Sequence, residues 1–298
     1  MEKISIILLN YNGVEDTKEC INSIITNQEN NKQFNYDIIV VDNNSSDNSI
    51  LELKKIDYIK LIELKNNGGF AFGNNAGIKY ALDNGADYVF LLNNDTIITK
   101  DCISKLYNEI KKHEDVGIIG ARVMFYDNKN LINYYDGKIN WFKGTATIKG
   151  KSKIYKENNK QFIYTNFMTG CCMLIKRKVL EEVGLLPEEY FMYYEDVDFC
   201  VQVQKFGYKL GVCLDSIIYH KESSSSGGAG SPFAIQWNTR NRLIFIKKYK
   251  CYGILTKLFF YATRVVVMLK YLIKGQKEQL KALIIGINEG RKFKINEK

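Results

Sequence analysis

Short apolar runs alternate with segments of helical period from the N-terminus to residue 121, and this alternation constrains the fold of the chain most strongly. The apolar runs predict strands at Ile4–Leu9, Tyr36–Val41, Tyr58–Leu64, Tyr88–Leu92 and Val116–Ala121. The segments between them predict helices at Val14–Gln28, Asp47–Lys55, Phe70–Leu82 and Lys100–Lys112. Strands that alternate with helices are typical of right-handed βαβ units. We therefore expect an α/β fold with a mainly parallel central sheet, in which the carboxyl ends of the strands share one edge.

The run Tyr88–Leu92 stops abruptly at three short polar residues, Asn93, Asn94 and Asp95. An uninterrupted apolar run is typical of a parallel strand that is buried on both faces. In open α/β sheets, ligands bind beyond the carboxyl ends of such strands, where a carboxylate can hold a hard cation and, through it, a phosphate. Asn and Asp are also common in plain turns, so this segment alone leaves a turn and a site equally open.

Polar loops rich in Asn, Ser and Gly follow three other predicted strands, at Asn10–Gly13, Asp42–Asp47 and Lys65–Gly69. Together with Asn93–Asp95 they would gather on one rim, which indicates a nucleotide-binding surface. Asp42 stands at a strand tip, where its carboxylate could accept a hydrogen bond from the imide N–H of uracil or thymine. Helix capping explains Asp47 better than it explains Asp42.

Gly68 and Gly69 would let the backbone approach a ligand closely, and the helix from Phe70 would offer its first N–H groups to an anion. The surrounding sequence is neither GxGxxG nor a Walker A loop. It therefore indicates neither a Rossmann dinucleotide site nor a P-loop.

The part of the chain after residue 121 is less regular. Phe125–Tyr164 is rich in Tyr, Asn, Lys and Gly and predicts an irregular or β-rich insertion. After it we expect strands at Thr169–Ile175 and Tyr208–Tyr219, the second ending at His220, and helices at Arg177–Val183 and Glu195–Phe206. Ser223–Ser231 is a Gly/Ser loop, which is either a linker or a lid beside His220.

Glu195 and Asp196 open the second of these helices directly after an aromatic run. Acidic residues in a first helical turn often complement the helix dipole, and this explanation suits Asp198. It suits Asp196 less well, because a carboxylate beside aromatic rings can have a raised pKa, as a general base for a hydroxyl requires. His220 could bind a metal or a phosphate, although a single histidine is more often structural.

Composition places the chain among globular proteins, since 298 residues with 46% hydrophobic and 25% charged side chains allow one large or two modest domains. Seven cysteines without CxxC spacing favour reduced core thiols in a cytosolic protein, and the presence of only two histidines disfavours zinc. The N-terminus lacks the pattern of a signal peptide, so we expect no secretion.

The formal charge is +9, and the basic residues concentrate near the C-terminus. There Tyr252–Ile273 is strongly apolar but contains Lys257, Arg264 and Lys270, which we place on roughly one face of a helix. Such a helix fits the interface of a membrane better than a span across it. An amphipathic helix docked on the domain or in a dimer is the alternative.

Taken together, these motifs resemble the family 2 glycosyltransferases with a GT-A fold, in particular the rhamnosyltransferase-like branch. The matching segments run in family order and are Ile6–Gly13, Val40–Asp47, Asn66–Ile78, Phe90–Thr96, Thr169–Arg177, Phe191–Cys200, His220 and Arg240–Leu243. The resemblance implies a GT-A domain over residues 1–245, with a nucleotide-binding half at 1–122 and an acceptor half at 123–245. Residues 246–298 would form a basic, apolar helical region.

The resemblance also implies an activity, which is inverting transfer of a sugar from a UDP- or dTDP-sugar to a glycan or lipid-linked acceptor in cell-surface polysaccharide synthesis. Donor-binding residues would be Asn10, Tyr11, Asp42, Asn43, Asn67, Gly68, Gly69, Asn74, Asn93, Asn94 and Arg240. Asp95 and His220 would hold a divalent cation, Mg²⁺ or Mn²⁺, and Asp196, with Glu195 beside it, would be the catalytic base. The enzyme would work in the cytoplasm, at the inner face of the cell membrane, and no nucleic acid is expected as a partner.

Asn93 departs from the family pattern, since it stands where the first acid of the DxD metal motif is usual. An Asn carbonyl or a water can still ligate a hard cation, but with less charge. The alternative to an enzyme is therefore a nucleotide-sugar-binding or glycan-binding protein with a weakened metal site, which Asp95 and Asp196 argue against. A sugar nucleotidyltransferase is disfavoured because Leu8–Gly13 lacks a Gly-rich phosphate loop and a basic residue.

Overall fold

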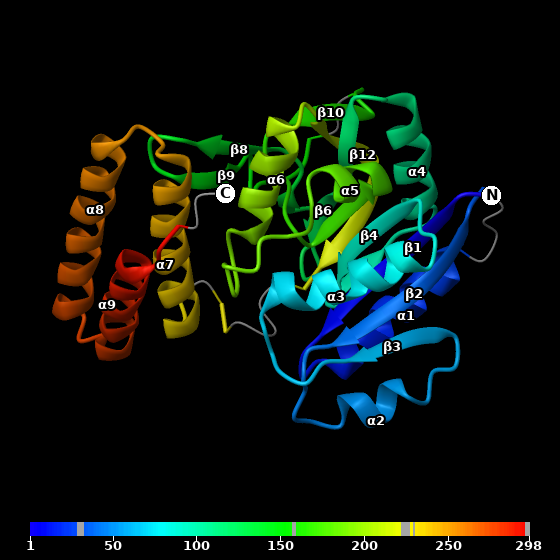
Figure 1. Cartoon of the computed structure of the whole chain (residues 1–298), viewed down its shortest axis with the longest axis horizontal. Helices are drawn as coiled ribbons and strands as arrows, with labels where there is room; N and C mark the ends of the chain where they lie inside the picture. Colours follow the sequence, from blue (N-terminus) through cyan, green and yellow to red (C-terminus); the bar gives the residue numbers. More distant parts are fainter. Residues whose placement is uncertain (29–32, 157–158, 222–226, 229, 296–298) are drawn as a thin grey trace.

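One mixed sheet runs through the computed structural model, which describes residues 1–28, 33–156, 159–221, 227–228 and 230–295. Within these ranges the sheet has ten strands, and its main path has the order β10-β12-β6-β11-β4-β1-β2-β3. A group of three helices stands beside the sheet at the C-terminal end of the chain (Figure 1).

The N-terminal half of the sheet is parallel, as the alternation of apolar and helical segments predicts. Its strands are β1 (Lys3–Asn10), β2 (Asn35–Asp42), β3 (Ile59–Glu63) and β4 (Tyr88–Asn93), in the spatial order 3-2-1-4. The connecting helices are α1 (Val14–Gln28), α2 (Ser49–Leu53) and α3 (Phe70–Asp83), and α4 (Cys102–Lys112) follows further on. Ile6, Val40 and Phe90 are fully buried, because helices cover both faces of these strands.

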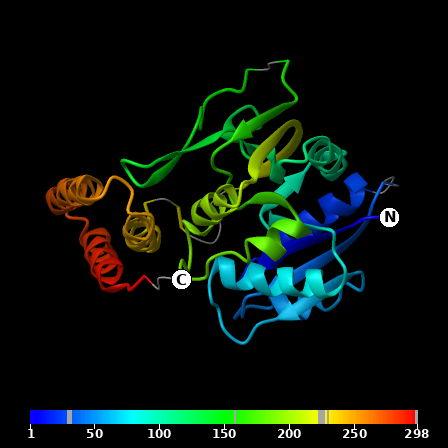
Figure 2. The same ribbon diagram turned by 45° about the horizontal axis from the view of Figure 1, so that its top comes forward.

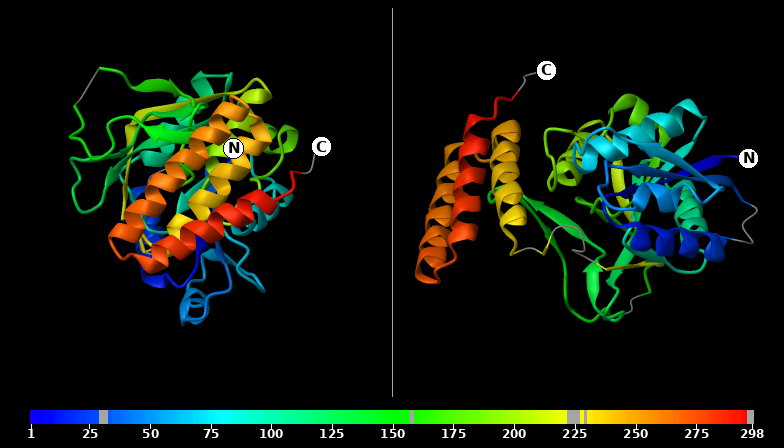
Figure 3. Two further views of the ribbon diagram at one scale, coloured as in Figure 1. Left: turned by 90° about the vertical axis from the view of Figure 1, so that its left-hand side faces the viewer. Right: turned by 90° about the horizontal axis from the view of Figure 1, so that it is seen from below.

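Helix α3 packs unusually close to the sheet because two glycines face it. A Cβ atom at Gly73 would lie 2.3 Å from the side chain of Leu9, and one at Gly77 would lie 2.7 Å from that of Ile7. Helices α1 and α4 neighbour each other on the opposite face (Figure 3). This close packing fixes the position of the loop that leads into α3, which belongs to the predicted rim.

Beyond β4 the order of the strands differs from a simple βαβ succession. Strand β11 (Cys172–Lys176) lies antiparallel between β4 and β6 (Val116–Phe125), and β12 (Lys209–His220) runs parallel to β6 on its other side. A short strand that the sequence does not predict, β5 (Thr96–Ile98), pairs with the end of β12 and sets Thr96 opposite His220. This pairing brings the residues after β4 and the end of β12 to the same place.

The predicted insertion is β-rich. It contains β7 (Ile132–Tyr134), β8 (Gly137–Asn140) and β9 (Thr145–Ile148), and β10 (Phe162–Thr165) completes the edge of the main sheet. Helices α5 (Arg177–Glu182) and α6 (Glu195–Lys205) follow where the sequence places them. The predicted loop Ser223–Ser231 falls largely outside the described residues.

The C-terminal helical unit consists of α7 (Pro232–Tyr249), α8 (Ile254–Ile273) and α9 (Lys277–Lys292), which stand apart from the sheet (Figures 2 and 3). Glycines again permit the closest contacts, since a Cβ atom at Gly286 would lie 2.5 Å from the carbonyl oxygen of Gln236. The expected division after residue 245 falls inside α7, so the helical unit begins at Pro232. No helix in the described ranges is long and apolar enough to cross a membrane.

The hairpin of β8 and β9 joins the helical unit to the sheet. Trp141 at its tip stacks on Phe245 of α7 with 5.9 Å between ring centroids, and the Lys143 carbonyl accepts a hydrogen bond from Arg242.

All seven cysteines are free thiols, and burial raises the pKa of Cys20 and of Cys102 to about 12. These thiols therefore act as core side chains, as the sequence predicts.

Candidate active site

The tip of β1 meets the tip of β2 through a buried polar network. Asn10 donates from Nδ2 to Asp42 Oδ2 at 2.7 Å, and Ser45 donates to the same carboxylate from its amide at 2.8 Å and its hydroxyl at 2.7 Å. Asp42 is fully buried by these contacts. The sequence predicts that Asp42 accepts a hydrogen bond from a nucleobase, and in the structure its carboxylate binds the loop after β2. A base could reach it only if this loop moves.

Asn43 offers an acceptor beside Asp42 that is still free. Its Nδ2 donates to Asn67 Oδ1 at 2.9 Å and to the Gly69 carbonyl at 3.2 Å. Its Oδ1 is buried and has no hydrogen-bond partner within the described ranges. A buried acceptor without a partner is costly unless a ligand supplies a donor. Asn43 is therefore a second candidate, beside Asp42, for contact with an imide N–H once the loop opens, while Tyr11 lies exposed on the same rim.

Gly69 is needed for contact with the protein itself. Its φ is +91°, and a Cβ atom there would lie 2.0 Å from the carbonyl oxygen of Phe191. That carbonyl accepts a hydrogen bond from the amide of Phe70 at 2.9 Å. The sequence predicts that a ligand approaches Gly69 closely, but the segment before α6 occupies this place. The amide of Phe70 at the start of α3 already donates a hydrogen bond to that segment. At Gly68, an added Cβ would collide with the Phe72 side chain.

Asn74 lies one turn into α3, 2% exposed, and donates to the Phe70 carbonyl at 2.9 Å. It therefore supports the start of the helix. Contact with a donor stays a prediction for this residue.

Asp95 and His220 form a pair at the centre of the rim. Asp95 Oδ1 lies 3.1 Å from His220 Nε2, and both side chains are nearly buried. Burial acts to raise the pKa of Asp95, but the hydrogen bond and the charge of His220 outweigh it and lower the pKa overall. The Asn93 amide lies 3.4 Å from the same imidazole nitrogen. Asn94 instead turns toward α1, where it donates to the Thr17 hydroxyl at 2.9 Å.

This donor set fits a cation that is shared with a diphosphate. No group of three or more His, Cys, Asp or Glu side chains that could hold a metal occurs in the described residues. Mg²⁺ commonly binds one or two carboxylates and completes its shell with water and substrate phosphates. Asp95 and His220 would hold such an ion. His220 Nδ1 is buried and has no hydrogen-bond partner among the described residues. Asn93 adds no charge, so the protein alone would bind the ion weakly.

Asp196 faces the start of β11 from the first turn of α6. Its Oδ2 accepts a hydrogen bond from the Gly170 amide at 3.0 Å, and its Oδ1 accepts one from the Val197 amide at 2.8 Å. Burial raises the pKa of Asp196 to about 6, against the effect of these two donors. Burial, followed by the charge of Asp196, raises the pKa of Glu195 well above its usual range. Of the two carboxyl groups, Glu195 therefore holds its proton more tightly than a free glutamate, while Asp196 releases its proton near pH 6.

The backbone before this pair is strained. Tyr193 and Tyr194 both have positive φ, 69° and 77°, which is rare for a bulky residue. Asn241 of α7 holds them in place, because its fully buried side chain donates to the carbonyls of Met192 at 2.8 Å and Tyr193 at 2.9 Å. The sequence contains Asn241 in the motif Arg240–Leu243 but does not indicate this function.

Lys248 and Arg240 strengthen the same contact between α7 and the segment before α6. Lys248 Nζ lies 2.7 Å from both Glu189 Oε1 and the buried Asp198 Oδ2. Asp198 therefore has a structural partner in Lys248, in addition to the expected place in the first turn of α6. Arg240 donates to the Glu189 carbonyl at 2.9 Å and lies over the Trp237 ring at 5.1 Å. Its contact with a leaving diphosphate stays a prediction.

A parallel sheet with a polar rim, an Asp–His pair on that rim and a carboxylate of raised pKa at the start of α6 define a nucleotide-sugar transferase of GT-A type. The model of glycosyl transferase family 2 matches residues 5–184, which is more than half of the chain. The chain belongs to this family and is a glycosyltransferase that acts on nucleotide sugars.

Relatives with assigned activities cover most of the chain. A low-salt glycan biosynthesis hexosyltransferase, Agl10 of Haloferax volcanii, is 28% identical over 82% of this chain and 75% of its own length. The dTDP-rhamnosyl transferase RfbF of Shigella flexneri is 24% identical over 76% of this chain and 75% of its own length. A poly-beta-1,6-N-acetyl-D-glucosamine synthase of Staphylococcus epidermidis is 27% identical over 70% of this chain and 48% of its own length.

Solved structures confirm the fold. GalNAc-T7, crystallised with UDP, GalNAc and Mn²⁺, superposes with a TM-score of 0.66 at 15% identity and covers 83% of this chain. Staphylococcus aureus TarS superposes with a TM-score of 0.54 at 16% identity, also over 83%. This chain spans 48% and 40% of those two chains, respectively. The expected GT-A fold is therefore confirmed.

Proposed function

We propose that this glycosyltransferase moves a sugar, with inversion, from a UDP- or dTDP-sugar to a hydroxyl of a glycan or lipid-linked acceptor in cell-surface polysaccharide synthesis. The observation that carries the proposal is the Asp196 carboxylate, whose pKa of about 6 leaves it ionised yet basic at neutral pH. The names of the relatives, a hexosyltransferase and a dTDP-rhamnosyl transferase, support a hexose or rhamnose donor.

Asp196 would take the proton from the acceptor hydroxyl as its oxygen attacks the anomeric carbon. The bond from that carbon to the diphosphate oxygen breaks on the opposite side, and its electron pair leaves with the diphosphate, so the configuration inverts. The Gly170 and Val197 amides orient the base. Burial and the charge of Asp196 raise the pKa of Glu195, which disfavours a second negative charge beside the base. Asp95 and His220 would hold a divalent cation, which when bound offsets the charge of the leaving diphosphate.

The outer face of α8 supports a membrane contact for the same enzyme. The large apolar residues exposed along this helix are Ile254, Leu255, Leu258, Tyr261, Val265, Val266, Leu269, Leu272 and Ile273. With 3.6 residues per turn, Lys257 and Lys270 fall on opposite edges of this apolar face. Arg264 points inward, with its guanidinium 5.7 Å from the Phe260 ring. At about 100° per residue, Arg264 lies close to Lys257 around the helix, whereas Lys270 lies on the other edge of the apolar face. The expected single face therefore holds two of the three cations and does not include Lys270.

An apolar helix face between two lysines matches an anionic lipid surface, where apolar side chains enter the acyl boundary and cations meet headgroups. We place the enzyme at the inner face of the membrane, close to a lipid-linked acceptor. Docking of α8 on the domain, the alternative to membrane contact, accounts for the buried Phe260 and Thr256. It leaves the exposed apolar residues of α8 unexplained.

A panel of UDP- and dTDP-sugars with Mn²⁺ tests the activity directly. The proposal expects release of free nucleoside diphosphate from one donor class, stimulated by acceptor glycans. Donor binding without release from any member of the panel would favour the glycan- or nucleotide-sugar-binding alternative.

A further inference from the structure

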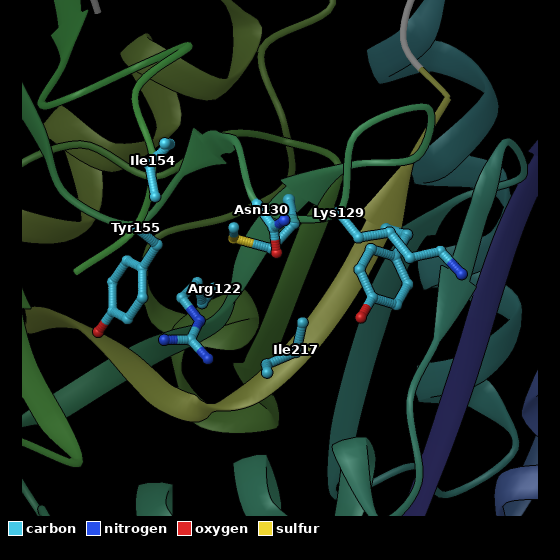
Figure 4. Close-up of a pocket in the computed structure, with 8 residues that line it drawn as sticks. Arg122, Lys129, Asn130, Ile154, Tyr155 and Ile217 are labelled. Atoms are coloured by element: carbon cyan, nitrogen blue, oxygen red, sulfur yellow. The ribbon is translucent and has the colours of Figure 1, made fainter. Parts of the chain in front are cut away.

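A hollow of about 190 Å³ lies on the sheet outside the site described above. Its lining residues are Arg122, Met124, Lys129, Asn130, Ile154, Tyr155, Ile217 and Tyr219. Strands β6 and β12 form its floor, where Arg122 is paired with Ile217 and Met124 with Tyr219. The insertion supplies its walls. Figure 4 shows the Arg122 side chain beside the Tyr155 ring, above the strand that carries Ile217.

The hollow is separate from the donor site. Tyr219 and His220 are consecutive residues of β12, and successive side chains of a strand point to opposite faces of the sheet. His220 contacts Asp95, so Tyr219 and its cross-strand neighbours face the other side. A ligand in the hollow would therefore not compete with the nucleotide sugar.

The chemistry of the hollow is that of a receptor for an anion. Arg122 is half-buried, its guanidinium carbon lies 3.9 Å from the Tyr155 ring centroid, and its Nε is enclosed without any hydrogen-bond partner in the described ranges. Lys129 stands at the rim over the Tyr219 ring at 5.0 Å. Among the residues that the structure describes, two cations and no acid line the hollow. A planar guanidinium held by stacking presents a fork of donors that matches a carboxylate or a phosphate.

The walls hold this arrangement before any ligand arrives. The Tyr155 amide donates to the Asn130 carbonyl at 3.0 Å, and Leu131 forms a β-bridge with Ile154. Both rim segments are thus fixed to each other by backbone hydrogen bonds, and the tyrosine that stacks on Arg122 belongs to one of them. Pockets for drug-sized ligands have volumes of roughly 300–1,000 Å³. The smaller volume of this hollow suits one charged group with part of a sugar ring.

We propose that this hollow binds an anionic group of a glycan, either the carboxylate of a uronic acid or a phosphate ester. The group lies in the fork of Arg122, with Lys129 adding charge and the two tyrosines packing on the attached ring. The identification of the carrier as a glycan rests on the proposed function, whereas the anion site itself does not.

Isothermal titration calorimetry of the full chain in metal-free buffer tests the site with D-glucuronate, inorganic phosphate and D-glucose. We expect saturable binding of at least one anion and none of glucose. Glucuronate alone would identify a carboxylate group, and phosphate alone a phosphate ester. Because the readout needs no turnover, an inactive enzyme that still binds the anion would refute the proposed function and leave this site standing.

Variants localise the binding. Arg122→Gln should weaken it about tenfold or more, since a charge-assisted, forked contact is lost, and Arg122→Lys should fall between the two. Lys153→Gln removes one exposed charge from the same insertion without touching the hollow and should leave affinity within about twofold. Absence of anion binding in the wild type, or equal affinity of wild type and Arg122→Gln, overturns the proposal.

Discussion

The buried side chain of Asn241 donates to the carbonyl of Tyr193 at 2.9 Å and thereby ties the C-terminal helical unit to the backbone that precedes Asp196. Two residues of positive φ follow one another there. Such backbone persists only where its surroundings hold it, and the same amide also holds the Met192 carbonyl. The helical unit is therefore part of the construction of the active site.

Replacement of Asn241 by Ala should lower turnover more than it lowers donor affinity. Two part-buried carbonyls would lose their donor, which costs up to about 1–3 kcal/mol for each unsatisfied group and loosens the base. We expect kcat to fall roughly tenfold to a hundredfold, with the KM for the donor changed by less than about threefold. Asn238→Ala, which removes an amide that donates to the Ala234 carbonyl within α7, is the matched control. Equal losses in kcat for both variants would contradict the positioning role.

The pH dependence should follow the raised pKa of Asp196. Its carboxylate must be ionised to accept a proton, so kcat/KM should rise with pH through about 6 and level off above 7. The pKa of Asp196 in the folded protein exceeds the ordinary value of 3.8 for this side chain, so the folded protein holds the proton more tightly. Stability from this group is therefore present at low pH and is lost as pH rises from about 4 to 6.

Measurement of the pH–rate profile checks the first expectation, and denaturant unfolding of wild type and Asp196→Asn across pH 4–7 checks the second. The variant should lack the part of the stability change that comes from this residue. A rate profile that is flat between pH 5 and 8 would speak against Asp196 as the ionising base.

The Asp95–His220 pair predicts how the donor responds to metal. Asp95→Asn removes the carboxylate that contacts His220 and should weaken Mn²⁺-dependent donor binding about tenfold or more, whereas binding without Mn²⁺ should change little. Asn93→Asp supplies the missing charge and should tighten Mn²⁺ binding. Titration of Mn²⁺ in the presence of the nucleoside diphosphate measures both. Identical Mn²⁺ affinity in wild type, Asp95→Asn and Asn93→Asp would remove these residues as the metal site.

The exposed face of α8 predicts binding to anionic vesicles. Leu258→Ser together with Val265→Ser should reduce co-sedimentation with vesicles that contain phosphatidylglycerol at least several-fold, because both side chains are exposed apolar residues of this face. Leu51→Ser, an exposed apolar residue on α2, is the control. Retained vesicle binding, or a dimer that the double variant dissociates, would assign the face to a protein partner.

The sequence predicts the nucleotide-binding half well because its signals are local. Apolar runs and helical periods place β1 to β4 and their helices within a few residues, and the polar loops after them meet on one rim. The order of the later strands depends on long-range pairing, so neither the insertion of β11 between β4 and β6 nor the pairing of β5 with β12 is visible in the sequence. Only that pairing explains why His220 reaches Asp95.

For some residues the sequence predicts a role at the site, but the structure shows a different contact from the one predicted. A glycine pair predicts a close approach but not what approaches, and at Gly69 it is the Phe191 carbonyl. A carboxylate at a strand tip predicts a polar contact but not its partner, and Asp42 meets Asn10 and Ser45. Asn241 carries no local signal, because a single buried amide in a helix becomes meaningful only beside the strained backbone that it holds.

The central claim, that Asp196 is the base of a glycosyl transfer, is tested most directly by comparing wild type and Asp196→Asn with the donor that the panel identifies. We expect the variant to bind this donor within about twofold of the wild type. Its transfer rate should be about 10²–10⁴ times lower, as expected for loss of a general base. Undiminished transfer by Asp196→Asn, with a product of the same inverted configuration, would contradict it.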